Sequence, residues 1–174
     1  GTPSGKENDK VFDVTTSTGS TEVGAYAAEV NYYLGEYTLT SITSYTDSES
    51  ASTVLATGFP LLILPNNDSF SDASQFTQEL RITSPADGAF TYQAGLYYYK
   101  NKLERDFYRV QDFTTIGFPF FFSTSNSSSV ESESASIFGQ GTWHLNDVTR
   151  LTLGLRYNDE KITLDQTLAL EDLP

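Results

Sequence analysis

The feature that most constrains this chain is an alternation of apolar and polar side chains in six separate stretches. The stretches are residues 23–34, 37–46, 75–84, 90–100, 135–145 and 150–159. A period of two is typical of β-strands that have one apolar and one polar face. The sequence therefore predicts an all-β fold built from about six long strands.

The connections between these strands are alternately very short and very long. Residues 33–37, 85–88 and 146–149 are tight reversals that carry Gly, Pro, Asp or Asn. The intervening segments 47–73 and 104–134 are far longer than ordinary strand connections. An antiparallel meander with short turns at one end and long loops at the other is typical of the wall of a transmembrane β-barrel.

This pattern divides the chain into three expected parts. Residues 1–22 are polar and without period, and we expect a loop or an irregular strand there. Residues 23–161 are expected to form the six-stranded wall, and residues 162–174 a C-terminal loop. Six tilted strands are too few to close around a lumen, since about eight make the smallest ordinary barrel. The wall is therefore expected to be incomplete.

Composition excludes several classes of function. The formal charge is −13, which argues against nucleic acid as a partner, because phosphate binding needs clustered Lys and Arg. There is no Cys, so disulfides and thiolate metal sites are excluded. No run of about 18 apolar residues is present, which excludes a transmembrane helix. His144 has no second His or Cys to join it, and no nucleophile is paired with a base, so we expect no metal, no cofactor and no enzyme activity.

Three groups of side chains are candidates for functional roles. Aromatic residues beside the short turns are expected at a membrane interface: Tyr33, Tyr37, Phe90 and Trp143. Charged residues within the strands are expected to face a wet lumen, with a structural ion-pair ladder as the alternative: Glu29, Glu79, Arg81 and Arg156. Apolar residues after two Gly-Phe-Pro sequences are expected to contact a ligand or another copy of the chain, or else to pack over the loop base: Phe59, Leu61, Leu62, Phe118, Phe120 and Phe121.

Several strand sequences resemble consecutive strands of TonB-dependent outer-membrane receptors. They are Tyr-Thr-Leu-Thr-Ser-Ile-Thr-Ser-Tyr at 37–45, Gln-Phe-Thr-Gln-Glu-Leu-Arg-Ile-Thr-Ser at 75–84, Tyr-Gln-Ala-Gly-Leu-Tyr-Tyr-Tyr at 92–99, Ser-Ile-Phe-Gly-Gln-Gly-Thr-Trp-His-Leu at 136–145 and Arg-Leu-Thr-Leu-Gly-Leu-Arg-Tyr at 150–157. The resemblance implies part of a barrel of about 22 strands that is filled by a plug. It also implies a bacterial outer-membrane location, contact with membrane lipid, and uptake of siderophores, vitamin B12 or glycans. No segment here resembles the plug, so a fragment of such a receptor is expected.

A second hypothesis treats the chain as a self-assembling structural fragment. An unclosed wall has two edge strands whose free N–H and C=O groups can pair with further copies. Homo-oligomers in the form of a tube, ring or filament, located outside the cell, would then satisfy both edges.

Overall fold

A computed structural model describes residues 17–54, 66–114 and 117–173 of the chain. Their six strands are β1 (Thr18–Leu34), β2 (Tyr37–Thr53), β3 (Asn66–Thr83), β4 (Phe90–Asp112), β5 (Phe121–Asn146) and β6 (Thr149–Leu173). Among the described residues, no helix is long and apolar enough to cross a membrane.

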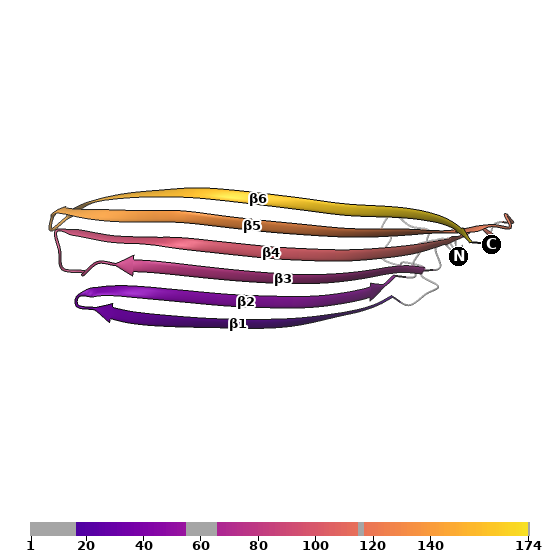
Figure 1. The fold of residues 1–174 in the computed structure, drawn as a ribbon, viewed down its shortest axis with the longest axis horizontal. Coiled ribbons are helices and arrows are strands. Elements are labelled where there is room, and N and C mark those ends of the chain that lie inside the picture. The colour runs from indigo at the N-terminus through magenta and orange to yellow at the C-terminus, as the bar shows by residue number, and fades with distance from the viewer. Residues whose placement is uncertain (1–16, 55–65, 115–116, 174) are drawn as a thin grey trace, which may run out of the picture.

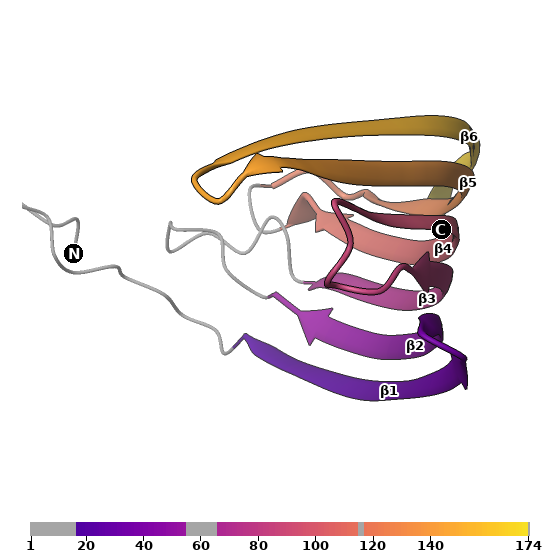
Figure 2. The same ribbon diagram turned by 90° about the vertical axis from the view of Figure 1, so that its left-hand side faces the viewer.

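The strands form one antiparallel sheet in the order β1-β2-β3-β4-β5-β6, so each strand pairs with its neighbours in the sequence. Figure 1 shows the short turns gathered at one end of the sheet, and the end of β2, the start of β3 and the connection between β4 and β5 at the other. Figure 2, turned by 90°, shows a single curved layer with β1 and β6 at opposite borders. This confirms the predicted all-β meander and its incomplete barrel wall.

The strands are longer than the sequence pattern predicts. Most of the segment 47–73 is strand, since β2 runs to Thr53 and β3 begins at Asn66. Most of 104–134 and of 162–174 is strand as well. The reason is that backbone pairing needs no apolar side chains, whereas the prediction ended each strand where its apolar alternation ended. The prediction of loops over most of 47–73, 104–134 and 162–174 is therefore wrong, because these residues are mainly in strands.

The register assigns every strand residue to one of two faces. Residues directly opposite each other on paired strands share a face, and such a set across the sheet is called a row here. One row contains Leu80, Leu96 and Ile137, and we name its side of the sheet the Leu80 face. The next row on the other side contains Arg81 and Arg156, and we name that side the Arg81 face.

No hydrophobic side chain is buried among the described residues, so this sheet has no core of its own. Three of the few buried polar side chains, Thr40, Ser134 and Ser136, lie on the Arg81 face. The large apolar side chains are instead exposed, with Leu155 at 86% and Tyr157 at 70%. A single layer of this kind needs an apolar environment on one side.

The turn between β1 and β2 is made by Gly35 and Glu36. Gly35 has φ 64°, and no described non-glycine residue has a positive φ. Glycine in this conformation at the first central position is the requirement of a type II′ turn, whose twist matches that of paired strands. The local sequence thereby sets the register of the first hairpin.

Candidate functional site

The Leu80 face carries a continuous apolar band across all six strands at the short-turn end. Its members, apart from aromatic residues, are Val30, Leu34, Leu39, Leu80, Ile82, Leu96, Ile137, Leu151, Leu153 and Leu155. Apart from Ile82, which is of intermediate exposure, these side chains are all more than a third exposed. Ala94 lies in the row of Ile82, and Ala28 and Ala135 lie in the adjacent row on the same face. The band is the surface that an apolar environment would cover.

Aromatic side chains border this band at both ends. At the turn end, Phe90 and Trp143 lie opposite each other with ring centroids 4.5 Å apart, and Tyr37 lies on the same face. Tyr33 differs from these three, because its row places it on the Arg81 face, where it is 73% exposed. A second aromatic border lies at the loop end and consists of Tyr26, Tyr45, Phe76, Tyr98 and Tyr157. It was not predicted from the sequence, because only the aromatic residues beside the short turns were considered.

The distance between the two borders matches a membrane. In β4 they are marked by Phe90 and Tyr98, which are about 26 Å apart along the strand at ~3.3 Å per residue. With a strand tilt of roughly 40°, this corresponds to about 20 Å of height, close to the ~25 Å band of outer-membrane barrels. The band is therefore tall enough to face the hydrocarbon region of a bilayer.

Gln78 breaks the apolar pattern of the Leu80 face, but its amide is satisfied. Its Oε1 accepts a hydrogen bond from the Thr43 hydroxyl at 2.5 Å, and its Nε2 donates to the Ser41 hydroxyl at 3.0 Å. Its Nε2 also lies 3.2 Å from the backbone carbonyl of Glu79. Because a buried polar group is costly only when it is unpaired, this cluster can lie in an apolar environment.

Beyond the aromatic border at the loop end, the Leu80 face becomes strongly acidic. The acidic collar consists of Glu22, Asp47, Glu49, Asp68, Asp72, Glu104, Asp106, Glu131, Glu133 and Asp165. Lys100 pairs with Glu131 at 3.0 Å, and Lys102 with Glu104 at 2.9 Å. Hydrogen bonding to Glu104 raises the pKa of Lys102, and hydrogen bonding from Lys100 lowers the pKa of Glu131. These exposed pairs add little stability.

The Arg81 face holds all four charges that the sequence analysis singled out, in two adjacent rows. Glu79 and Arg81 form an ion pair at 3.3 Å. Glu29 lies in the row of Glu79 and accepts a hydrogen bond from Asn31 at 2.7 Å. Arg156 lies in the row of Arg81, with its guanidinium 5.4 Å from the Tyr97 ring centroid. Glu29 and Arg156 thus share the face but make no ion pair with Glu79 and Arg81 among the described residues.

Arginines and lysines lie on opposite faces of the sheet. Every arginine of the chain lies on the Arg81 face: Arg81, Arg105, Arg109, Arg150 and Arg156. The described lysines lie on the Leu80 face: Lys100, Lys102 and Lys161. The sequence analysis missed Arg105 and Arg109 because it treated 104–134 as loop. Their shared parity with Tyr97 and Tyr99 in one strand is the signal that could have found them.

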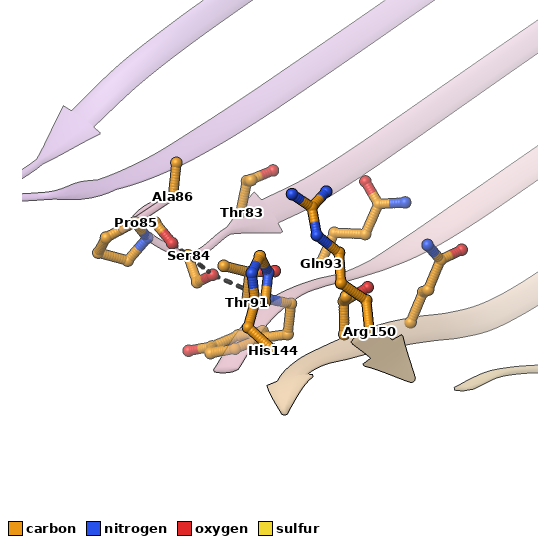
Figure 3. A pocket seen from close by; sticks show the side chains of 11 residues that line it. Thr83, Ser84, Pro85, Ala86, Thr91, Gln93, His144 and Arg150 are labelled. Carbon is orange, nitrogen blue, oxygen red and sulfur yellow. Dashed lines mark hydrogen bonds between the residues drawn. The ribbon is translucent and has the colours of Figure 1, made fainter. Parts of the chain in front are cut away.

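A polar hollow of about 420 Å³ lies on the Arg81 face near the short turns. Figure 3 shows His144 and Arg150 extending side by side from β5 and β6 toward polar side chains of β3 and β4. Thr83 and Gln93 line the same hollow. Ser84, at the rim, accepts a hydrogen bond from the backbone N–H of Tyr92 at 2.8 Å. No group of three or more His, Cys, Asp or Glu that could hold a metal ion occurs among the described residues.

Phenylalanines cluster at the connection between β4 and β5. Phe113 stacks on Phe120 and Phe122, with centroid distances of 5.0 and 5.3 Å, and Phe118 lies 5.8 Å from Phe120. Phe121 begins β5, opposite Asp112. The expected contact role of Phe118, Phe120 and Phe121 stays a prediction. Phe59, Leu61 and Leu62 lie outside the described residues.

The open meander and its two-sided wall define a segment of an outer-membrane type of β-barrel. The model of the family described as TonB dependent receptor-like, beta-barrel matches residues 2–170. The chain belongs to this family, whose members are transport receptors of the bacterial outer membrane rather than enzymes. Comparison with curated proteins gives no match.

One solved structure supports this fold, and a second is reported with it. The ferric yersiniabactin uptake receptor FyuA from Yersinia pestis is similar with a TM-score of 0.59 and 18% identity over 90% of this chain. The siderophore receptor PiuA from Acinetobacter baumannii matches 87% of this chain with a TM-score of 0.38 and 12% identity. The chain spans only 24% of the first protein and 30% of the second.

Gly95 lies in the Arg81 row and lets the Leu80 carbonyl oxygen and the Phe138 ring approach its Cα closely. Its replacement is therefore expected to destabilise the wall. A methyl group in Gly95→Ala would lie 2.6 Å from the Leu80 carbonyl oxygen and 2.6 Å from the edge of the Phe138 ring. We expect a loss of about 1–3 kcal/mol in the free energy of unfolding. The measurement is urea unfolding of the protein in lipid vesicles, followed by circular dichroism.

Gly139→Ala is the matched control, because the nearest atom to its methyl group is 3.7 Å away. Its effect should stay within about 0.5 kcal/mol. Equal effects of the two substitutions would contradict the role given to the close approach at Gly95.

Proposed function

We propose that this chain forms part of the barrel wall of a receptor that imports a scarce nutrient across the bacterial outer membrane. The observation that carries the proposal is the separation of an apolar band on one face from arginines and hydrogen-bonding side chains on the other. The Leu80 face then contacts outer-membrane lipid, and the Arg81 face lines the lumen. Tyr37, Phe90 and Trp143 belong to the girdle on the short-turn side.

In this proposal the outer edges of β1 and β6 pair with further strands of the same barrel. The similarity to a quarter of a longer receptor structure supports this arrangement over pairing between copies. The Arg81 face would then meet a plug, as the family implies, and Glu29, Glu79, Arg81 and Arg156 would lie at that boundary. Self-assembly into a tube, ring or filament has no separate observation in its favour.

Among siderophores, vitamin B12 and glycans, the wall best suits a siderophore. Many ferric siderophores are anionic, and arginine is the side chain best suited to bind anionic oxygen atoms by paired hydrogen bonds. Placing every arginine on the proposed lumen face of a chain with charge −13 favours such a cargo. FyuA is itself described as a ferric yersiniabactin uptake receptor.

A charge placed in the apolar band should impair membrane insertion. Leu96→Arg in the middle of the band is expected to cost about 2–4 kcal/mol in the folded, inserted state. Gln93→Arg is the control, because it adds the same side chain to the opposite face of β4. The fraction inserted into lipid vesicles is measured by protection from protease. Equal loss for both variants would contradict the assignment of the faces.

Uptake tests the function directly. The receptor that contains this chain is expressed in an outer membrane lacking other receptors, and radioactive ferric siderophores, labelled cobalamin and maltodextrin are offered in turn. We expect uptake of at least one ferric siderophore, and its loss when the TonB protein is removed. Uptake of cobalamin or maltodextrin alone would contradict the siderophore assignment, and uptake of none would overturn the proposed function.

A further inference from the structure

We infer that the Leu80 face of β4, β5 and β6 holds one phospholipid with a phosphoethanolamine headgroup at a fixed place. Its acyl chain lies in a groove of the apolar band, and its headgroup lies on Lys161 and Glu133. This inference rests on the proposed function, because it requires the Leu80 face to lie in a bilayer. It adds the class of lipid and the residues that hold it.

The groove is a hollow of about 540 Å³ at the aromatic border of the loop end. Tyr98 and Tyr157 line it together with Leu96 and Ile137, which are 54% and 57% exposed. Ala135 lies between Tyr98 and Asp159 in one row, and all three line the groove. Because alanine is much smaller than its neighbours in this row, the surface is hollowed here.

The groove continues toward the short turns, along the strands. Leu80, Leu96 and Ile137 also line a second apolar hollow of about 290 Å³, which extends to Ile82 and Ala94. From the row of Gln78 to that of Ile82, the two hollows cover about 13 Å along β3. A narrow apolar channel of this length and direction fits a single acyl chain. Since the bilayer is as apolar as the groove, packing alone holds the chain, and lipid selectivity has to come from the headgroup.

The row directly beyond the groove alternates in charge, with Lys161 on β6, Glu133 on β5 and Lys100 on β4. Lys100 is paired with Glu131. Lys161 and Glu133 are exposed and lie directly opposite each other, but they form no ion pair within the described part of the chain. One carboxylate oxygen of Glu133 accepts a hydrogen bond from the Tyr98 hydroxyl at 2.7 Å. Its other oxygen and the Lys161 ammonium can therefore bind a ligand.

This pair of charges matches a headgroup that carries both signs. Neighbouring strands are about 4.8 Å apart, which is comparable with the separation of phosphate and ammonium in phosphoethanolamine. The phosphate can accept hydrogen bonds from Lys161 while the ammonium donates to Glu133, and both contacts are charge-assisted. A purely anionic headgroup would be repelled by Glu133, by Asp159 at the outer end of the groove and by the acidic collar. A choline headgroup has no N–H group to donate to Glu133.

The test measures which lipid the purified receptor that contains this chain retains. The receptor in detergent is offered an equimolar mixture of phosphatidylethanolamine, phosphatidylglycerol, phosphatidylcholine and lipid A, and the bound lipid is identified by native mass spectrometry. We expect phosphatidylethanolamine to be retained about fivefold or more above each of the others, because it alone satisfies both charges.

Filling the groove should release the lipid. Ala135→Leu places a larger apolar side chain on the groove floor and is expected to lower retention of phosphatidylethanolamine by about fivefold. Ala28→Leu is the matched control, because Ala28 lies in the same row on β1, at the opposite border of the sheet. Its retention should stay within about twofold of the parent.

Removing the two headgroup contacts should abolish selectivity between headgroups. For Lys161→Gln/Glu133→Gln we expect the ratio of retained phosphatidylethanolamine to phosphatidylglycerol to fall to about one. Lys102→Gln/Glu104→Gln is the matched control, since it removes one charge of each sign from an ion pair further along the same face. Its ratio should equal that of the parent. Circular dichroism checks that all variants fold alike.

Equal retention of all four lipids, preference for another lipid, or equal effects of a variant and its control would overturn the lipid site. Uptake of ferric siderophore by the same receptor keeps this result separate from the proposed function. If uptake persists without any lipid preference, only the lipid site is wrong. If the parent receptor neither inserts into membranes nor takes up cargo, the proposed function is overturned, and the lipid site with it.

Discussion

The backbone hydrogen bonds between neighbouring strands are the interaction on which the rest of this structure depends. The sheet has no buried hydrophobic side chain among its described residues, so no core holds the strands together. Pairing is continuous from β1 to β6, with a register shift only between His144 and Asn146. In an apolar medium unpaired backbone groups are very costly, so such a ladder is the stable arrangement for a chain that crosses a bilayer by strands.

The fixed register is also what gives the two faces their different chemistry. A shift of one residue would move every side chain of a strand to the other face, and would place its arginines on the side of the apolar band. The tight Gly35 turn and the Trp143–Phe90 contact fix the register near the short turns. Phe138 covers Gly95 within the Arg81 row, which adds a contact specific to this alignment. The difference between the two faces therefore depends on one turn and on side-chain contacts between neighbouring strands.

Much of the fold could be predicted from the sequence because apolar and polar residues alternate regularly in the parts of the strands that form the apolar band. The ends of the strands could not, because Ser-rich and acidic segments such as 123–134 pair through their backbones without an apolar pattern. The same limit hid Arg105 and Arg109, which lie in a segment expected as loop. Tyr33 was assigned by its nearness to a turn, but parity places Tyr32 on the band side instead. Face assignment requires the strand parity as well as the position along the chain.

The continuous pairing of β4, β5 and β6 beyond the aromatic border has a mechanical consequence. Side chains on a solvated loop change position as the loop moves. In a paired strand, successive side chains on one face are instead held about 7 Å apart. In the proposed receptor, these strand ends would present side chains at fixed spacing to a molecule that approaches from the loop end. Contact with such a molecule would then begin beyond the apolar band.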